Sequence, residues 1–336
     1  MLIYAFLSAI IINMKIFLTA ICVLLGFSVQ PATVDAQLDA QALVNPELIL
    51  ELQPEFPRPG EEVTITLNDY RGGTYGSAVT WLFNGNVIAE AENKRSTKVT
   101  AGALGTSDTI EVVLSKPGGG REVITSVVRP VYLDIIVEPQ TRVPNFYLGR
   151  ALPSIQSMVN VTALVNDGRF RNDLVYTWRV NRKVLEGGPI RSQNKMSFEM
   201  PMGNEAILSL TVTEPTGRVL ARRATFIPSV SPEMRFHTVS SLYGVNTKAI
   251  DDEYVLIGNS TTVRAEPYYL DSRVYNNPDI AQWQINNVTS DTVGNNPYEV
   301  TIQRVGLSGT TNLEFHVRDT TNQVLQGTED SIQIRF

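Results

Sequence analysis

The segment VTWLFN, residues 79–84, has two counterparts later in the chain, YTWRVN at 176–181 and AQWQIN at 281–286. In all three, alternate positions are apolar and most of the positions between them are polar, which is the pattern of a half-buried strand. The central tryptophans, Trp81, Trp178 and Trp283, are roughly 100 residues apart, which is the length of one immunoglobulin-type domain. The chain therefore contains a unit that occurs three times.

The second half of each unit also repeats. An alternating apolar triplet follows each tryptophan by roughly thirty residues and leads into a turn-rich segment, which is typical of a hairpin. The triplets are Ile110/Val112/Leu114, Leu208/Leu210/Val212 and Leu313/Phe315/Val317. With the shorter alternating runs between them, each unit has about seven strands, and two facing antiparallel sheets can bury them around the tryptophan. We therefore expect an all-β chain of three tandem immunoglobulin-like (Ig-like) β-sandwiches after an N-terminal signal or anchor helix.

Proline-bearing segments indicate the joins between units, near Arg129-Pro130 and within residues 227–232. They predict Ig-like domains at 46–130, 131–229 and 230–336, with short and stiff connections. Before their second strand, units two and three carry the long stretches 141–157 and 238–259. Such stretches either bind partners or cover a sheet edge or a domain junction, and both interpretations remain open.

The repeats resemble the bacterial Ig-like and PKD-type repeats of exported envelope proteins, and the resemblance covers residues 45–336. PKD repeats usually read Trp-x-Phe-Gly-Asp-Gly at the tryptophan strand. Here the first unit reads WLFNGN at 81–86, so the Gly-Asp-Gly element is missing, as are the inter-sheet cysteines of antibody domains. The resemblance implies a role as a spacer, an adhesive module or a part of an envelope assembly.

The first 29 residues are nearly all apolar and contain a single charge, Lys15, directly after Met14. Counted from Met14, this run resembles a signal peptide, and Val34-Asp35-Ala36 suits cleavage before Gln37. We expect a signal peptide at 1–36 and an unstructured leader at 37–45, with an uncleaved membrane anchor as the alternative. The protein is then exported, to the periplasm, the cell surface or the medium. The only cysteine, Cys22, lies in this run, so the mature domains contain no disulfide.

The composition argues against several functions. The net charge is −6, from 28 basic and 34 acidic side chains, and no basic block predicts nucleic-acid binding. The two histidines, His237 and His316, have no partner at metal-ligand spacing, and His316 is expected to face solvent. Neither a nucleophile elbow nor a phosphate-binding loop occurs. We therefore expect a protein that is not an enzyme and has no catalytic residue, metal or cofactor, while calcium binding stays open.

One loop is a candidate binding site. Tyr268, Tyr269 and Tyr275 lie close together before Trp283, and aromatic rings on a loop can stack on sugars. Packing over the end of the sandwich explains these tyrosines as well. The expected function is a non-catalytic envelope protein, a rod of Ig-like domains that acts as a spacer or as a component of a surface assembly. The alternative is an adhesin that binds glycan or protein through this loop. The expected partners are other envelope proteins or surface glycans, with N-terminal membrane attachment as a further candidate.

Overall fold

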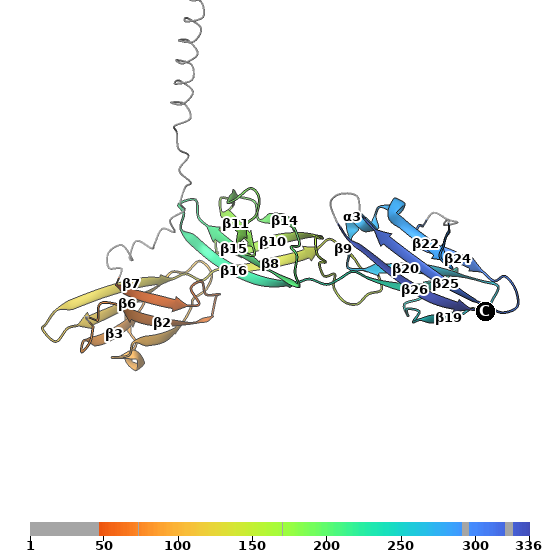
Figure 1. The fold of residues 1–336 in the computed structure, drawn as a ribbon. Helices are drawn as coiled ribbons and strands as arrows, with labels where there is room; N and C mark the ends of the chain where they lie inside the picture. Colours follow the sequence, from red (N-terminus) through yellow and green to blue (C-terminus); the bar gives the residue numbers. More distant parts are fainter. Residues whose placement is uncertain (1–46, 73, 170, 291–295, 320–324) are drawn as a thin grey trace, which may run out of the picture. The chain divides into compact units, whose positions relative to one another are not determined.

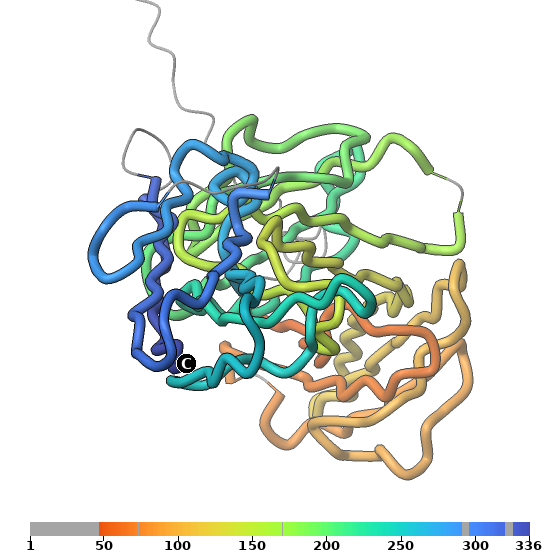
Figure 2. Tube along the Cα trace, turned by 90° about the vertical axis from the view of Figure 1, so that its right-hand side faces the viewer, coloured from red at the N-terminus to blue at the C-terminus, as the bar shows by residue number. Residues whose placement is uncertain are grey.

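The computed structural model describes residues 47–336, except residues 73, 170, 291–295 and 320–324 (Figure 1). The signal peptide, anchor and leader expected in residues 1–45 lie outside the described residues. Within them, almost every element is a strand, and each sandwich is built from consecutive residues, as the gradual colour change in Figures 1 and 2 shows. The all-β class and the three tandem Ig-like sandwiches are confirmed for this part of the chain.

The first sandwich contains two antiparallel sheets. One has the order β1-β2-β5 and the other the order β4-β3-β6-β7, so the division is three strands against four. A short 3₁₀ helix, η1 (Ala89–Ala91), follows β4. The strands are β1 (Leu48–Gln53), β2 (Glu62–Asp69), β3 (Ala78–Phe83), β4 (Asn86–Val87), β5 (Ser96–Thr100), β6 (Asp108–Ser115) and β7 (Arg121–Val128).

The second sandwich repeats this arrangement. Its sheets have the orders β14-β10-β8 and β12-β11-β15-β16, and β13 also pairs with β11. The strands are β8 (Tyr132–Pro139), β10 (Met158–Asn166), β11 (Val175–Val180), β12 (Lys183–Val184), β13 (Ile190–Arg191), β14 (Lys195–Glu199), β15 (Glu205–Thr213) and β16 (Val219–Pro228).

The third sandwich extends both sheets, to β18-β17-β20-β24 and β19-β26-β25-β22-β23. A short helix, α3 (Ser272–Tyr275), and a 3₁₀ helix, η2 (Pro278–Ile280), precede β22. The strands are β17 (Glu233–Ser240), β18 (Gly244–Val245), β19 (Glu253–Val255), β20 (Ser260–Tyr268), β22 (Ala281–Ile285), β23 (Val288–Ser290), β24 (Glu299–Gln303), β25 (Thr310–Arg318) and β26 (Gly327–Arg335). A separate pair, β9 (Thr141–Arg142) with β21 (Leu270–Asp271), joins the second sandwich to the third.

Each sandwich has its own hydrophobic core, and these cores extend over 48–128, 131–227 and 234–334. Trp81, Trp178 and Trp283 are 0%, 1% and 0% exposed and belong to the three cores in turn. All nine residues of the alternating triplets are buried as well. The period of two places these side chains on the inner face of a sheet, where burial of apolar surface stabilises the sandwich. The domain limits 46–130, 131–229 and 230–336 stay predictions.

An asparagine three residues after each tryptophan forms the turn that follows the strand. Asn84, Asn181 and Asn286 have φ angles of 48°, 49° and 49°, and the residue after each also has a positive φ, as a tight hairpin turn requires. Each asparagine side chain also accepts a hydrogen bond from the neighbouring strand. The donors are the backbone N–H groups of Thr109, Ile207 and Asn312, at 2.8, 2.9 and 2.9 Å. The recurrence of Asn therefore has a structural cause.

Every sandwich has two distinguishable ends. We call the end where the first strand begins the leading end, and the end where the last strand finishes the trailing end. Because the second strand is antiparallel to the first, the loop between the second and third strands lies at the leading end. The loop between the first and second strands lies at the trailing end.

Candidate functional site

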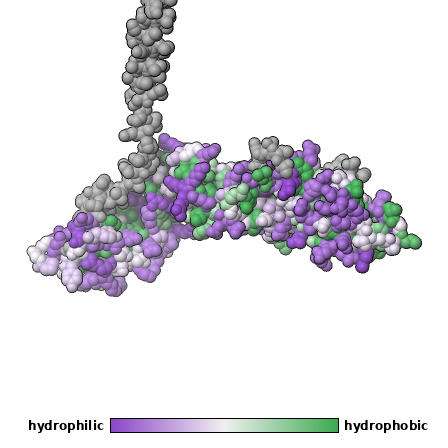
Figure 3. Space-filling model, viewed as in Figure 1, coloured by the Kyte–Doolittle hydropathy of each residue, from purple (hydrophilic) through white to green (hydrophobic). Residues whose placement is uncertain are grey.

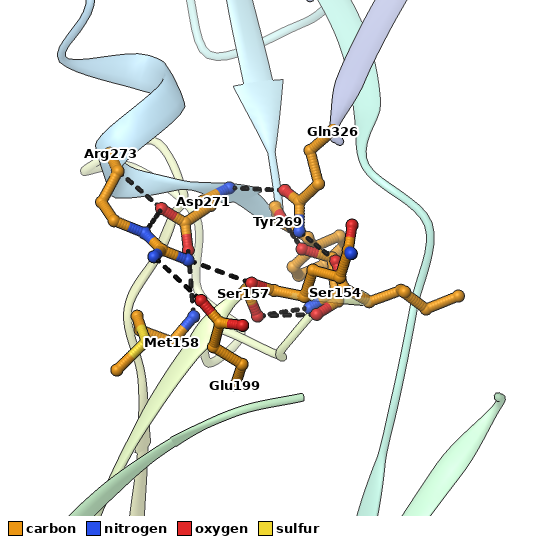
Figure 4. Close-up of polar contacts among 10 residues, drawn as sticks. Ser154, Ser157, Met158, Glu199, Tyr269, Asp271, Arg273 and Gln326 are labelled. Carbon is orange, nitrogen blue, oxygen red and sulfur yellow. Dashed lines mark hydrogen bonds and ion pairs between the residues drawn. The ribbon is translucent and has the colours of Figure 1, made fainter. Parts of the chain in front are cut away.

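The leading end of the third sandwich meets the trailing end of the second in a polar contact region, drawn in Figure 4, which we call the second joint. Its backbone framework is the two-stranded sheet of β9 and β21, in which Leu270 pairs with Arg142 and Asp271 with Thr141. The N–H of Tyr269 donates to the carbonyl of Arg142 at 2.7 Å, and that of Ser272 donates to Gln140 at 2.9 Å. Part of the long stretch 141–157 therefore serves as a strand at this joint.

Asp271 is the central acceptor of the second joint. Its carboxylate is fully buried, and one oxygen accepts the backbone N–H of Met158, from the other sandwich, at 2.9 Å. The other oxygen caps helix α3, since it accepts the N–H of Arg273 at 2.7 Å and its Nε at 3.0 Å. A buried carboxylate is costly unless such charge-assisted bonds surround it. The two sandwiches therefore share the hydrogen bonds that satisfy the carboxylate of Asp271.

The guanidinium of Arg273 extends the same contact to other residues of the second sandwich. It donates to Gln156 O at 3.0 Å and forms an ion pair with Glu199 at 3.2 Å. The hydrogen bond to Asp271 raises the pKa of Arg273, against the opposing effect of burial, and Glu199 adds to the rise. Figure 4 shows the side chain lying between the two carboxylates. Arg273 thus connects the third sandwich to two separate segments of the second.

Hydrogen bonds on the other side of Asp271 involve a turn of the second sandwich. Gln326 accepts the N–H of Asp271 at 3.1 Å and donates through its Nε2 to the carbonyl of Ile155. Ser154 Oγ donates to the carbonyl of Tyr269 at 2.7 Å. Ser157 Oγ donates to the carbonyl of Ser154 at 2.7 Å and accepts its N–H at 3.0 Å, so the turn itself is held in place.

Aromatic side chains pack beside this polar network. The hydroxyls of Tyr147 and Tyr269 are 2.6 Å apart, and the ring of Tyr147 meets that of Tyr268 edge-on at 5.5 Å. The ring of Phe146 lies 5.1 Å from that of His237. The hydrogen bond to Tyr147, with burial, raises the pKa of Tyr269 to about 12, and burial raises the pKa of Tyr268. Both tyrosines are half-buried.

Tyr275 lies within the third sandwich, close to the joint. Its ring stacks on Tyr298 at 4.6 Å, and the guanidinium of Arg142, from β9, lies 4.9 Å from its centre. Arg142 also forms an ion pair with the buried Glu266 at 3.5 Å. The three tyrosines proposed from the sequence as a binding loop therefore all have packing partners in the structure. Two of them, Tyr268 and Tyr269, belong to the second joint.

One histidine is buried and the other is half-buried. His237 is 1% exposed, and its Nδ1 lies 2.8 Å from the carbonyl of Asn246. His316, expected to face solvent, is half-buried on β25. Among the described residues, no group of three or more His, Cys, Asp or Glu side chains could hold a metal ion. A search of the same residues for a helix long and apolar enough to cross a membrane found none.

The sequence interpretation did not single out Asp271, Arg273, Ser154 or Gln326. One local signal was present, because Asp271 precedes the short segment SRVY and aspartate is a preferred helix N-cap. That signal predicts the bonds of Asp271 to α3. It does not predict the hydrogen bond from the N–H of Met158, which is more than a hundred positions earlier in the sequence.

Comparison with known proteins gives similarities of fold. No family model matches the chain, and no curated protein sequence matches it. Among solved structures, the fibronectin(III)-like modules of Clostridium thermocellum CbhA match at 11% identity, with 54% of this chain and 94% of that one covered and a TM-score of 0.25. Three N-terminal domains of the bacteriophage RB49 Hoc capsid protein match at 10% identity, 85% and 97% coverage and a TM-score of 0.25. The central fibronectin-III array of RIM-binding protein matches at 10% identity, 86% and 95% coverage and a TM-score of 0.27.

Proposed function

We propose that this chain is a non-catalytic, exported protein of the bacterial envelope, of the PKD or bacterial Ig type. Its sandwiches act as a spacer or as a component of a surface assembly. A spacer must keep a distance under load, so the stiffness of its joints is the property on which this function depends. The second joint is the observation that carries the proposal.

The stiffness of the second joint follows from its chemistry. To separate the second and third sandwiches, the buried carboxylate of Asp271 must lose the N–H of Met158, and Arg273 must lose Glu199 and the carbonyl of Gln156. Breaking a buried charge network by removing partners costs about 3–5 kcal/mol. The strand pair β9–β21 and the bond from Gln326 to Ile155 must break as well. Bending at this joint is therefore far more costly than bending at a joint without shared bonds.

The experiment is a distance measurement across the joint. Spin labels at introduced Lys183→Cys and Thr289→Cys, in a chain that also carries Cys22→Ser, report the separation of the two sandwiches. We expect one narrow distance distribution, and Asp271→Ala should broaden it. A broad distribution in the unaltered joint would contradict the spacer role. Small-angle scattering of the same chain should then give an elongated particle.

Export is a separate part of the proposal, supported by the apolar run around Lys15 and by Val34-Asp35-Ala36. N-terminal sequencing of protein from the native envelope should begin at Gln37. If protein from the membrane fraction instead begins at Met1 or Met14, the N-terminal segment is an uncleaved anchor and not a cleaved signal peptide. Recovery of the full-length chain from the cytoplasm would contradict export in either form.

A further inference from the structure

The joints of this chain always combine the same two ends. The trailing end of the first sandwich contacts the leading end of the second, where the backbones at Gly105 and Gly168 approach so closely that a Cβ on Gly168 would lie 2.5 Å from Gly105 N. The trailing end of the second sandwich contacts the leading end of the third through β9 and β21. Both joints within the chain therefore place a trailing end against a leading end, in the order that the chain connects them.

The trailing ends use equivalent residues for this contact. In the first sandwich, Phe56, from the loop between the first and second strands, packs against the core of the second sandwich. In the second sandwich, the equivalent loop supplies Phe146 and Tyr147, which contact His237, Tyr268 and Tyr269. Each occupied trailing end thus offers large apolar side chains from the same loop.

The trailing end of the third sandwich has the same kind of side chains, and they are exposed. They come from the loop between β17 and β20 and from the loop between β24 and β25. Hydrophobic side chains gather at this end in Figure 3, beyond β24 and β25. Leu242, Tyr243, Ile257, Val305 and Leu307 are between 84% and 93% exposed. Single exposed apolar residues are ordinary, but a group of five at one end indicates an interaction surface.

The leading end of the first sandwich offers a matching surface. Tyr70 and Tyr75 are 72% and 91% exposed and border a hollow of about 570 Å³ that also includes Thr74 and Arg95. Asp69 holds this loop, because it accepts the N–H groups of Thr74 at 2.7 Å and Arg71 at 3.0 Å. Arg95 donates to the hydroxyl of Thr74 at 2.6 Å. These bonds hold Arg71 and Thr74, which neighbour the two tyrosines, in place, and such local order lowers the entropy cost of binding.

We propose that copies of this chain associate head to tail, with the trailing end of the third sandwich of one copy docked on the leading end of the first sandwich of the next. The contact repeats between chains the arrangement that the chain already forms twice within itself. Such a contact joins two different surfaces, so it leaves one free at each end of every assembly and generates open chains of copies. The inference is independent of export and of the stiffness of the second joint, and it names a partner that the proposed function does not.

The test is sedimentation velocity of the purified full chain over a wide concentration range. We expect a ladder of species that lengthens with concentration. Leu307→Asp, which alters the tail, and Tyr75→Asp, which alters the head, should each weaken association by about tenfold or more, since each replaces an exposed apolar or aromatic side chain of the contact with a carboxylate that association would have to desolvate. Both side chains are exposed, so the fold should be retained. Phe226→Asp, at an exposed aromatic residue on β16, is the matched control and should leave the ladder unchanged.

A mixture of the two blocked variants gives the sharpest outcome. The tail-blocked copy retains a working head, and the head-blocked copy retains a working tail, so the mixture should form dimers of one copy of each and nothing longer. A chain that is monomeric at all concentrations would overturn the proposal. So would association that survives both substitutions, as it would if the apolar N-terminal run or a symmetric contact held the copies together. A monomer that binds a different protein through these ends would overturn it too.

Discussion

The two joints of this protein both use aromatic side chains of the trailing end, but they differ in their polar contacts. At the first, the N–H of Val131 donates to the carbonyl of Pro57 at 2.9 Å, and the ion pair of Glu55 with Arg222, at 3.2 Å, is formed by side chains that are 62% and 48% exposed. At the second, the shared carboxylate of Asp271 is fully buried. Exposed ion pairs contribute about 0–1 kcal/mol, whereas a buried and satisfied charge is lost at much greater cost. The comparison teaches that a joint is stiff where its polar groups are buried together.

The largest effect is expected for Asp271→Ala. The substitution leaves the N–H of Met158 and the guanidinium of Arg273 without their buried acceptor, so the free energy of unfolding should fall by about 3–5 kcal/mol. Urea unfolding, followed by the fluorescence of Trp178 and Trp283, measures the loss. Asp271→Asn retains one acceptor oxygen and should lose less. A loss below about 1 kcal/mol for Asp271→Ala would remove the distinction between the joints.

A smaller effect is expected at the first joint for Gly168→Ala. Both Gly168 and Gly60 have a positive φ, of 81° and 74°, but a Cβ on Gly60 would meet open space. Gly60→Ala therefore measures the backbone strain alone, and it should lower the free energy of unfolding by about 1 kcal/mol. Gly168→Ala should lower it by about 1–3 kcal/mol more, because its Cβ also clashes with the backbone at Gly105.

Hydrogen exchange shows which joint opens in that variant. The N–H of Val131 reports on the first joint and that of Met158 on the second. In Gly168→Ala, we expect exchange at Val131 to accelerate at least about tenfold while Met158 stays protected. Equal acceleration at both positions would mean that the two joints open together.

The smallest effect concerns the alkaline range and the second joint. The pKa of Tyr269 is raised to about 12, from about 10 in the unfolded chain, chiefly by its hydrogen bond with Tyr147. A raised pKa stabilises the fold below the unfolded value, and the contribution is lost as the pH rises from about 10 through 12. Tyr147→Phe removes the bond, so it should lower stability by about 1 kcal/mol at pH 8 and flatten the decline above pH 10. Identical slopes for the two proteins would refute the assignment.

The repeated sandwich could be predicted from the sequence because its signals are local. The period of two around Trp81, Trp178 and Trp283 decides which side chains face inward, whatever lies outside the strand. Asn84-Gly85 and Asn286-Asn287 predict turns for the same reason, since asparagine and glycine tolerate the positive φ that a tight turn requires. Neighbouring residues along the chain suffice to specify these features.

The second joint depends on residues that are far apart in the sequence. Asp271, Met158 and Gln326 come from three distant segments, and nothing near any of them indicates that the others are close. Similarly, an aromatic run such as Tyr268-Tyr269 has the same sequence whether it faces solvent or another sandwich. Its burial is decided by Tyr147, which is over a hundred positions earlier. The sequence by itself determined three β-sandwiches and their cores, through periodicity and turn chemistry. Only the tertiary structure decided which of their ends are covered, because burial depends on what packs against a residue and not on the residue alone.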